Sequence, residues 1–251
     1  MMLEVKNVTK VFYSNKYEDL TALEDVSLFV AKGEFVSIIG PSGCGKSTLL
    51  EMIAGLLKPT SGDIYLNGQS ITGKKGNTAY MPQKDVLFPW RTIIENVMIP
   101  LEVQGVKKAK AKQEALSLLP AFGLEQFADH YPEMLSGGMR QRVNFLRTFL
   151  FRKELMLLDE PFGKLDALTK MQMHKWLLKI LEQLKQTVLL VTHDIEEAIL
   201  LSDRIYVFSS RPGKIKREVV VTLDRPRTQE MITSSAFIEI KKQLFDLLKT
   251  D

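Results

Sequence analysis

Three segments of the chain are almost wholly apolar and end in glycine or polar residues. They are FVSIIG (residues 35–40), LMLLDE (155–160) and TVLLVTHD (187–194). Such runs are typical of strands buried on both faces of a parallel sheet. Ligands bind beyond the carboxyl ends of the strands in open α/β sheets, so we expect Gly40, Asp159, Glu160 and His193 to meet in one crevice.

The remaining segments follow other periods. Residues 3–30 alternate between apolar and polar positions as short strands do, and residues 62–71 predict a further strand and turn. Residues 92–152 carry helical patterns, and the stretch 111–131 is predicted to be mostly helix, broken near Pro120 and Gly123. This order predicts a helical lobe inserted between two strands of the core.

The last third of the chain predicts two more strands and a final helix. RIYVFSS (204–210) and REVVVTL (217–223) are the strands. Five apolar residues near the end fall on one helical face, which we expect to pack on the core: Phe237, Ile240, Leu244, Leu247 and Leu248.

Composition fits one soluble globular domain, with 251 residues, 45% of them hydrophobic and 25% charged. The net charge of +4 is too small to indicate nucleic-acid binding. The basic run at residues 107–112 predicts either a solvated helix face or a contact with a partner or anionic lipid. The single cysteine, Cys44, excludes an internal disulfide and fits a reducing compartment.

No apolar run approaches the roughly 20 residues that span a bilayer, and the first residues lack the apolar core of a signal peptide. We therefore expect another chain to supply any membrane span.

A phosphate-binding loop follows the first apolar run. GPSGCGKS (residues 40–47) fits GxxxxGK[ST] between a predicted strand and a predicted helix. In this motif the backbone N–H groups surround phosphate oxygens, Lys46 reaches the β- and γ-phosphates, and the Ser47 hydroxyl binds Mg²⁺. Cys44 occupies a variable position of the motif.

Acidic and histidine side chains follow the other two apolar runs. Asp159 suits the Mg²⁺ shell, and Glu160 is placed to orient or deprotonate a water near the γ-phosphate. His193 at its strand end predicts a phosphate contact rather than a structural role, and HDIEE lacks the second histidine of a zinc motif. Asp194 is predicted to cap the next helix, with Glu197 completing a capping box.

A second anion site is predicted at LSGGMRQR (residues 135–142). Ser136, Gly137 and Gly138 precede a helical run, and backbone N–H groups at a helix start attract anions. The expected buried face of this helix consists of Met139, Val143, Leu146 and Leu150.

Over nearly its whole length the chain resembles the ATP-binding subunit of an ABC transporter. The resemblance rests on five motifs in this order: the phosphate loop, Gln83 in YMPQ, LSGGMRQR, LMLLDEP and VTHD. The resemblance implies a P-loop NTPase core with a mostly parallel sheet, an N-terminal antiparallel β subdomain and an inserted helical subdomain. It implies one domain over residues 1–251, with 1–88 and 153–251 forming the β subdomain and P-loop core and 89–152 the helical subdomain.

The same resemblance assigns roles. Phe12, with Tyr13 as the alternative, matches the aromatic residue that stacks on adenine. ATP would be bound by Phe12, Gly40, Pro41, Ser42, Gly43, Cys44, Gly45, Lys46, Ser47, Thr48, Gln83, Ser136, Gly137 and Gly138. Mg²⁺ would be held by Ser47, Gln83 and Asp159. Lys46, Glu160 and His193 would be catalytic, and Asp166 matches the D-loop aspartate.

The implied function is the ATPase motor of a membrane importer. Two chains, expected to form a homodimer, would enclose two ATP molecules, and each LSGG would face the nucleotide of the other chain. Membrane permease subunits, and indirectly a substrate-binding protein, would be further partners, with the chain peripheral at the cytoplasmic face. Phe88 and Trp90 would either press on the permease or belong to the core.

Three short motifs resemble those of one branch of the family, the importers of nitrate, sulfonate, taurine and thiamine precursors. They are FPWRTIIENV, SSRPGKI and LDRPR. Two features depart from the family pattern. One is Lys164, in the D-loop where alanine is common, and the other is the bulky VNFLRTFL that follows the family's signature, LSGG (residues 135–138). The alternatives are a soluble ABC ATPase of DNA repair or translation, a P-loop metabolite kinase, and one half of an exporter.

Overall fold

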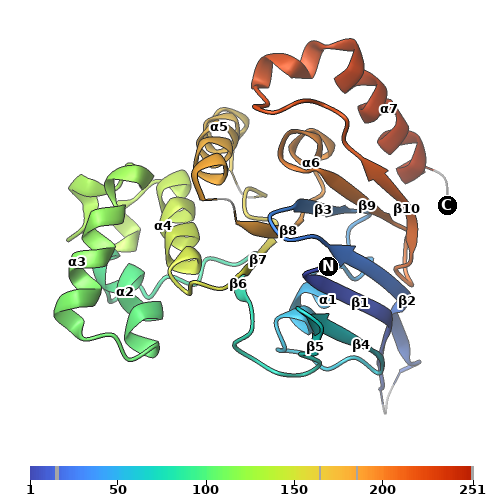
Figure 1. Ribbon diagram of the computed structural model, residues 1–251, viewed down its shortest axis with the longest axis horizontal. Coiled ribbons are helices and arrows are strands. Elements are labelled where there is room, and N and C mark those ends of the chain that lie inside the picture. Colours follow the sequence, from blue (N-terminus) through green and yellow to red (C-terminus); the bar gives the residue numbers. More distant parts are fainter. Residues whose placement is uncertain (15–16, 164, 185, 250–251) are drawn as a thin grey trace.

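The computed structural model describes residues 1–14, 17–163, 165–184 and 186–249. Two β-sheets lie next to each other, and a group of helices extends to one side of them (Figure 1). The smaller sheet has four strands in the order β2-β1-β4-β5. The larger has six in the order β10-β9-β3-β8-β7-β6.

The strands are β1 (Leu3–Phe12), β2 (Leu20–Val30), β3 (Phe35–Ile39), β4 (Ser61–Leu66), β5 (Gln69–Ser70), β6 (Ala79–Met81), β7 (Leu155–Asp159), β8 (Thr187–Val191), β9 (Arg204–Phe208) and β10 (Ile215–Val220). The α-helices are α1 (Lys46–Ile53), α2 (Ile93–Val103), α3 (Lys108–Leu118), α4 (Gly137–Phe149), α5 (Ala167–Leu184), α6 (Ile195–Leu201) and α7 (Ser235–Lys249). Short 3₁₀ turns are η1 (Pro120–Phe122), η2 (Glu125–Phe127), η3 (Pro132–Met134) and η4 (Gln229–Thr233).

The three apolar runs form the centre of the larger sheet, as predicted. Every residue of β3, β7 and β8 is buried, and β8 pairs in parallel with both β3 and β7. The helical lobe enters between β6 and β7, which also pair in parallel. At one edge of the sheet, β10 runs antiparallel to its neighbour β9.

The two faces of this sheet serve different cores. Leu155 and Leu157 lie in the core shared with α1 and the smaller sheet, whereas Met156 and Leu158 lie in the core shared with the helical lobe and α5. This division follows from the strand period of two, which points successive side chains to opposite faces. Because both faces are covered, no polar position is needed within the strand.

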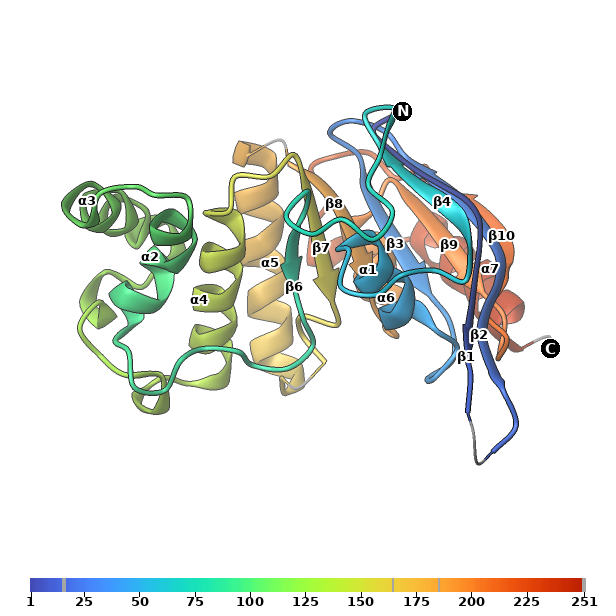
Figure 2. The same ribbon diagram turned by 90° about the horizontal axis from the view of Figure 1, so that it is seen from below.

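The alternating N-terminal segment forms strands, as the pattern predicted, and these strands lie in the antiparallel sheet that the resemblance implied. β1 pairs antiparallel with β2 and with β4, and Leu3 lies opposite both Val30 and Leu66. In Figure 2 this sheet lies at the far side from the helical lobe, with α1 between it and the larger sheet. α1 therefore buries apolar residues against both sheets.

In the helical lobe the predicted break near Pro120 and Gly123 is confirmed, but the prediction of mostly helix over residues 111–131 is wrong. α3 ends at Leu118, and the chain then makes only the single turns η1 and η2 instead of continuing as helix. Pro120 and Gly123, whose φ is +64°, explain the loss of helix, because both residues interrupt the helical hydrogen bonding. The boundaries at residues 89 and 152 stay predictions.

The basic run of residues 107–112 lies at the start of α3. All four of its lysines are exposed, whereas Ala111 is buried. The solvated helix face and the contact with a partner or anionic lipid both stay predictions.

The final helix, α7, packs as predicted. Phe237, Ile240 and Leu244 are buried, and Leu247 and Leu248 are partly buried against the same core, which includes residues of α6 and β9. Among the described residues, no helix is both long enough and apolar enough to cross a membrane.

Candidate functional site

The loop between β3 and α1 turns sharply before the helix begins at Lys46. Gly45 caps α1 with a φ of +103°, and a Cβ atom there would lie 2.7 Å from Leu23 Cδ2. Only glycine fits both the conformation and the space. The backbone N–H groups at the start of α1 therefore follow directly on the glycine-rich loop, the arrangement that binds phosphate.

The Lys46 side chain folds over its own loop. It is 5% exposed, and its ammonium donates to the carbonyl oxygens of Gly40 and Pro41, each at 2.8 Å. Its Nζ also lies 3.7 Å from Cys44 Sγ. The loop thus fixes the position of a positive charge beside the cavity.

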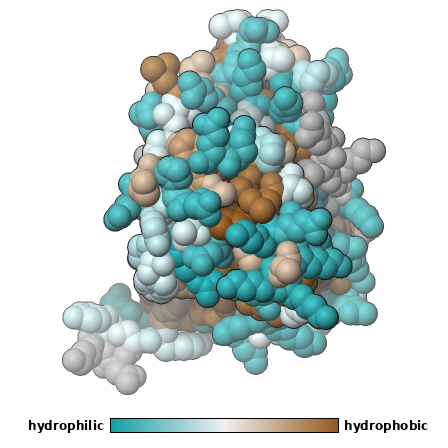
Figure 3. All heavy atoms as spheres, turned by 90° about the vertical axis from the view of Figure 1, so that its left-hand side faces the viewer, coloured by the Kyte–Doolittle hydropathy of each residue, from teal (hydrophilic) through white to brown (hydrophobic). Residues whose placement is uncertain are grey.

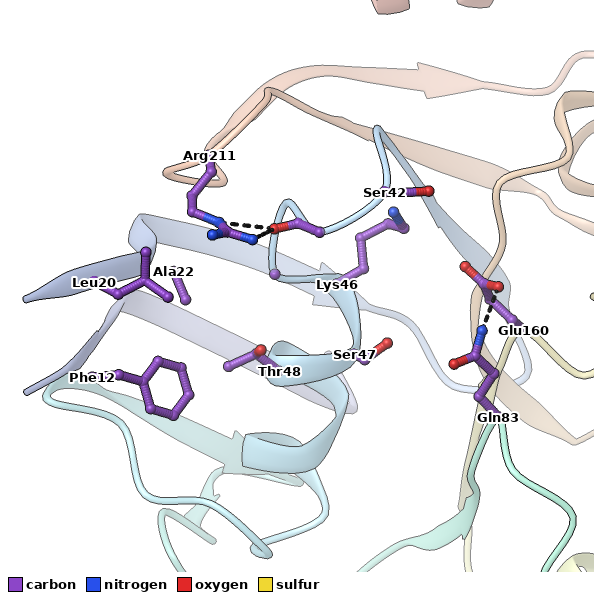
Figure 4. Close-up of a pocket in the computed structure, with 12 residues that line it drawn as sticks. Phe12, Leu20, Ala22, Ser42, Lys46, Ser47, Thr48, Gln83, Glu160 and Arg211 are labelled. Carbon is purple, nitrogen blue, oxygen red and sulfur yellow. Dashed lines mark hydrogen bonds between the residues drawn. The ribbon is translucent and has the colours of Figure 1, made fainter. Parts of the chain in front are cut away.

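A cavity of about 370 Å³ lies over this loop (Figure 4). The wall consists of Phe12, Leu20, Ala22, Ser42, Gly43, Gly45, Lys46, Ser47, Thr48, Gln83, Glu160 and Arg211. Gly40, Pro41 and Cys44, which we also predicted to bind ATP, are not on the wall. Of the two aromatic candidates, Phe12 lines the cavity, whereas Tyr13 does not and is 73% exposed.

Asp159, at the end of β7, is fixed next to the phosphate loop. Its two carboxylate oxygens accept hydrogen bonds from the Ser47 hydroxyl (2.9 Å) and the Tyr80 hydroxyl (3.3 Å). Burial raises the pKa of Asp159, and these two hydrogen bonds oppose that shift. Burial, together with the negative charge of Asp159, also raises the pKa of Tyr80.

The donor atoms at this point fit Mg²⁺. A carboxylate and a hydroxyl lie within 2.9 Å of each other, and Mg²⁺ is bound by one or two carboxylates together with hydroxyl, water and substrate phosphate oxygens. Within the described part of the chain no group of three or more histidine, cysteine or acidic residues could hold a metal ion. Because this pair supplies two protein oxygens, the remaining positions around a bound Mg²⁺ would be filled by water and phosphate oxygens.

Glu160 joins the ends of three strands. Its Oε2 accepts a hydrogen bond from Gln83 Nε2 (2.8 Å), which follows β6, and lies 3.3 Å from Nδ1 of His193, which follows β8. Its backbone is left-handed, with φ of +44°, a conformation that costs a non-glycine residue about 1–2 kcal/mol. The predicted meeting is confirmed in part. Asp159 bonds Ser47 of the phosphate loop and Glu160 contacts His193, but of Gly40, Asp159, Glu160 and His193 only Glu160 is on the cavity wall.

The signature residues lie elsewhere. Ser136 caps α4 by accepting a hydrogen bond from Met139 N (3.3 Å), and none of residues 136–138 is on the cavity wall. Val143, Leu146 and Leu150 are buried as predicted, and Met139 is partly buried. Within the described chain, the two predicted anion sites are therefore separate.

Bulky residues after the signature fill the core of the lobe. The centroid of the Phe145 ring lies 6.2 Å from that of Phe122 and 5.5 Å from that of Trp176. This packing accounts for the departure from the alanine-rich family pattern. In the D-loop, the exposed Asp166 accepts a hydrogen bond from Thr169 N (3.0 Å), and Lys164 lies outside the described residues.

The capping prediction for α6 is half right. Asp194 accepts a hydrogen bond from Glu197 N (3.1 Å), so it caps the helix. The capping box is wrong, because the Glu197 carboxylate accepts from the Thr192 hydroxyl (2.8 Å) instead of from Asp194 N. Asp194 N in turn donates to the same hydroxyl, and this competition prevents the reciprocal bond.

Glu197 belongs to a buried ionisable cluster that the sequence did not reveal. Lys170 Nζ lies 2.6 Å from Asp194 and 3.7 Å from Glu197, and His174 Nε2 lies 4.0 Å from Glu197. Burial raises the pKa of Glu197 to about 7, and burial together with the charge of Lys170 lowers the pKa of His174 to about 4. The cluster joins the N-terminal part of α5 to α6, next to the strand end that carries His193.

The two shifts act on stability in opposite directions. The folded chain holds a proton on Glu197 that the unfolded chain releases above the ordinary glutamate pKa of 4.5, so this contribution falls as the pH rises towards about 7. His174 contributes stability that grows with pH between about 4 and 6.5 and then levels off.

Replacing Glu197 with glutamine is expected to change the pH dependence of stability. The free energy of unfolding of Glu197→Gln, relative to the wild type, should increase between about pH 5 and pH 8 by roughly 1–3 kcal/mol. Urea unfolding at both pH values measures this difference. The partly exposed neighbour Glu196, changed to glutamine, is the control. A difference independent of pH would contradict the expectation.

Two residues of the site were missed by the sequence reasoning. Tyr80 is the first residue of YMPQ, in which only Gln83 was given a role. Arg211 lies in SSRPGKI, which predicted only a branch of the family. No local pattern places either side chain, because Tyr80 meets its partner across 79 residues and Arg211 across 168.

The phosphate loop, the carboxylates at the strand ends and the glutamine and histidine that contact Glu160 define an ATP-hydrolysing P-loop site. The ABC transporter family model matches residues 23–163, and the chain belongs to this family. It is an ATPase, built as an ABC ATP-binding cassette.

Two of the similar proteins are named as ATP-binding proteins of import systems. The chain is 40% identical to the nitrate import ATP-binding protein NrtD of Synechocystis sp. over 255 residues, covering 99% of this chain and 96% of NrtD. It is 49% identical to the formylaminopyrimidine import ATP-binding protein ThiZ of Halalkalibacterium halodurans over 208 residues, covering 83% of this chain and 81% of ThiZ.

A solved structure supports the fold. The dimeric post-hydrolysis state of an ATP-binding cassette bound to ADP and Pi has a TM-score of 0.77 and 34% sequence identity, covering 89% of this chain and all of that chain.

Proposed function

We propose that this chain is the motor subunit of a membrane importer, in which ATP binding closes two cassettes and hydrolysis reopens them. The observation that carries the hydrolytic role is the environment of Glu160. This carboxylate lies on the cavity wall beside the phosphate loop, and Gln83 and His193 both contact its Oε2. A carboxylate oriented in this way can accept a proton from the water that attacks the γ-phosphate.

The other residues of the site have complementary roles. Ser47 and Asp159, with the side-chain oxygen of Gln83, would hold Mg²⁺, which neutralises developing charge on the phosphates when bound. Lys46 would exchange contacts with its own loop for the β- and γ-phosphates. His193 would contact the γ-phosphate as well as Glu160, and Phe12 would stack on adenine.

The signature would complete the site of a second copy. Ser136 to Gly138 begin a helix whose N–H groups suit an anion, but they are not on the wall of their own cavity. In a twofold dimer each phosphate loop can meet the other chain's signature, which gives two equivalent sites. The dimeric state of the similar solved cassette supports this arrangement.

A rigid segment that exposes aromatic side chains supports a permease partner. Asn96 is buried, and its amide bonds the backbone of Phe88, Arg91 and Thr92. Phe88 and Trp90 are nevertheless 39% and 71% exposed, with ring centroids 5.3 Å apart. They are therefore not core residues, and a fixed, exposed aromatic pair suits a protein interface.

Residues 85 and 86, which directly precede this aromatic segment, contact α4, the helix that follows the signature. Asp85 lies 3.2 Å from Arg140 and accepts a hydrogen bond from Asn144 at the same distance, and Arg147 donates to Val86 O (2.9 Å). Movement of α4 on dimer closure would therefore carry the aromatic pair with it. The outer face of the lobe is mainly hydrophilic, with a small apolar area among polar side chains (Figure 3).

Replacing Trp90 with alanine is expected to separate transport from hydrolysis. The isolated Trp90→Ala cassette should keep its ATPase rate. It should lose most co-purification with the permease, and the complete complex should lose most ATP-driven uptake. The reason is that aromatic anchors of this kind often contribute 2 kcal/mol or more to binding, which is about 30-fold in affinity. Phe245→Ala, which removes an exposed aromatic side chain from α7, is the control. Normal permease binding by Trp90→Ala would exclude this surface.

We propose that the cargo is a small molecule of the nitrate, sulfonate, taurine or thiamine-precursor type, the branch that three short motifs of the chain resemble. The names of import relatives support this for nitrate, formylaminopyrimidine and aliphatic sulfonates. Through the permease, the chain would lie at the cytoplasmic face of the membrane, and a substrate-binding protein would select the cargo. Uptake by vesicles that contain the complete complex tests this proposal against the soluble ABC ATPase and the metabolite kinase, neither of which would support transport.

A further inference from the structure

The loop between β9 and β10, residues 209–214, packs directly on the phosphate loop. Gly213 N donates to Ala22 O (3.0 Å), and Gly213 O accepts from Glu24 N (3.1 Å). A Cβ atom on Gly213 would lie 2.1 Å from Cys44 O, so only glycine allows this approach. The β9–β10 loop is thus held between β2 and the phosphate loop.

The β9–β10 loop is also closed on itself. The Ser209 hydroxyl donates to Pro212 O (3.0 Å) and accepts from Lys214 N (2.9 Å), and Ser209 N donates to Lys214 O (2.9 Å). Arg211 lies at the tip between these bonds. Its backbone is therefore positioned by the fold before any ligand binds, which lowers the entropy cost of using its side chain.

The Arg211 guanidinium lies on the cavity wall. Its Nε and one terminal nitrogen donate to Gly43 O, at 3.0 and 2.8 Å (Figure 4). A guanidinium has five N–H donors in a planar fork, so these two bonds leave capacity for a phosphate oxygen. In Figure 4 Arg211 lies on the side of Lys46 away from Glu160.

We propose that Arg211 is a nucleotide-binding residue, whose guanidinium contacts the α- and β-phosphates of ADP and ATP while it holds the phosphate loop at Gly43. The inference rests on the proposed role of that loop. Glu160 marks the γ-phosphate end of the cavity and Phe12 the adenine end, so a cation on the side of Lys46 away from Glu160 faces the diphosphate between them.

The position of Arg211 beside the diphosphate predicts how its loss changes the nucleotide dissociation constants, KM and kcat. The diphosphate is present in both ADP and ATP and carries its charge before the reaction, so Arg211 contributes equally to substrate, transition state and product. Loss of the side chain should therefore raise the dissociation constants of ADP and ATP by the same factor. It should raise KM and leave kcat nearly unchanged.

The test compares three substitutions. Arg211→Ala removes the charge and the bond to Gly43. Arg211→Gln keeps an amide donor for Gly43 O but removes the charge, and Arg211→Lys keeps the charge but loses the planar fork. Lys214→Ala is the matched control, because it removes one positive charge from the same loop and Lys214 pairs with Glu24 away from the cavity wall.

Titration calorimetry with Mg-ADP and Mg-ATP, together with steady-state ATPase kinetics, gives the result. The alanine and glutamine variants should bind both nucleotides about tenfold more weakly, with kcat within about twofold of the wild type. The lysine variant should recover part of the affinity, and Lys214→Ala should match the wild type.

Several results would overturn the inference. Wild-type affinity in Arg211→Gln would show that the side chain only holds the loop. A fall in kcat with unchanged affinity would show a structural role, and a loss for ATP but not ADP would place the contact at the γ-phosphate. Lys46→Ala, measured in parallel, should bind neither nucleotide well. If it binds both normally, the phosphate-loop assignment itself is wrong, whatever Arg211 does.

Discussion

Glu160→Gln is expected to bind ATP with wild-type affinity and to hydrolyse it about 10²- to 10⁴-fold more slowly. Glutamine has nearly the same shape as glutamate, and its side-chain oxygen can still accept the hydrogen bond from Gln83. It cannot take up a proton from the attacking water. Phosphate release in single-turnover experiments measures the chemical step directly.

The same variant should also accumulate as an ATP-bound dimer, because closure would no longer be followed by hydrolysis. Size-exclusion chromatography with and without Mg-ATP measures this. Glu196→Gln, which changes a partly exposed glutamate paired with Lys241, is the control and should turn over normally and dissociate. Wild-type turnover in Glu160→Gln would show that another group activates the water.

The second large effect is expected at Ser136. Serine, aspartate and asparagine cap helices about equally well, so Ser136→Asp and Ser136→Asn should both keep the cap of α4. Aspartate adds a negative charge where we propose the partner's triphosphate to lie, and like charges in an interface cost several kcal/mol. Hydrolysis and ATP-dependent dimerisation by Ser136→Asp should therefore fall by about 100-fold or more.

The asparagine variant separates charge from shape. Ser136→Asn should lose less activity than Ser136→Asp, and both should bind ATP as monomers with wild-type affinity and melt at the wild-type temperature. If Ser136→Asp weakens ATP binding by the monomer, the signature acts on the nucleotide of its own chain.

Much of the fold could be predicted because local patterns determine it. The runs that became β3, β7 and β8 are apolar at both faces, and a doubly covered sheet explains them. Once these strands were placed, the rule for strand ends brought the phosphate loop, Glu160 and His193 together. The site was thus a consequence of topology as well as of motifs.

The predictions failed where the outcome depends on competing contacts. Glu197 has the spacing of a capping box, but the Thr192 hydroxyl binds both its carboxylate and Asp194 N, and nothing in the local sequence shows this. The place of Arg211 at the site could not be predicted from local sequence either. Arg211 reaches Gly43 only because the β9–β10 loop packs on a loop 168 residues earlier in the chain.

We propose that each ATP is hydrolysed between the phosphate loop of one chain and the signature of another. A mixture of Lys46→Ala with Ser136→Asp tests it. In a mixed dimer, the defects of both chains fall in one shared site, and the other site combines a normal phosphate loop with a normal signature.

The measurement is the ATPase rate of the equimolar mixture compared with the sum of the two variants measured alone. If the sites are shared and act independently, random pairing should restore about a quarter of the wild-type rate. If each chain hydrolyses ATP with its own signature, every site contains one defect, and the mixture will show no activity above that sum.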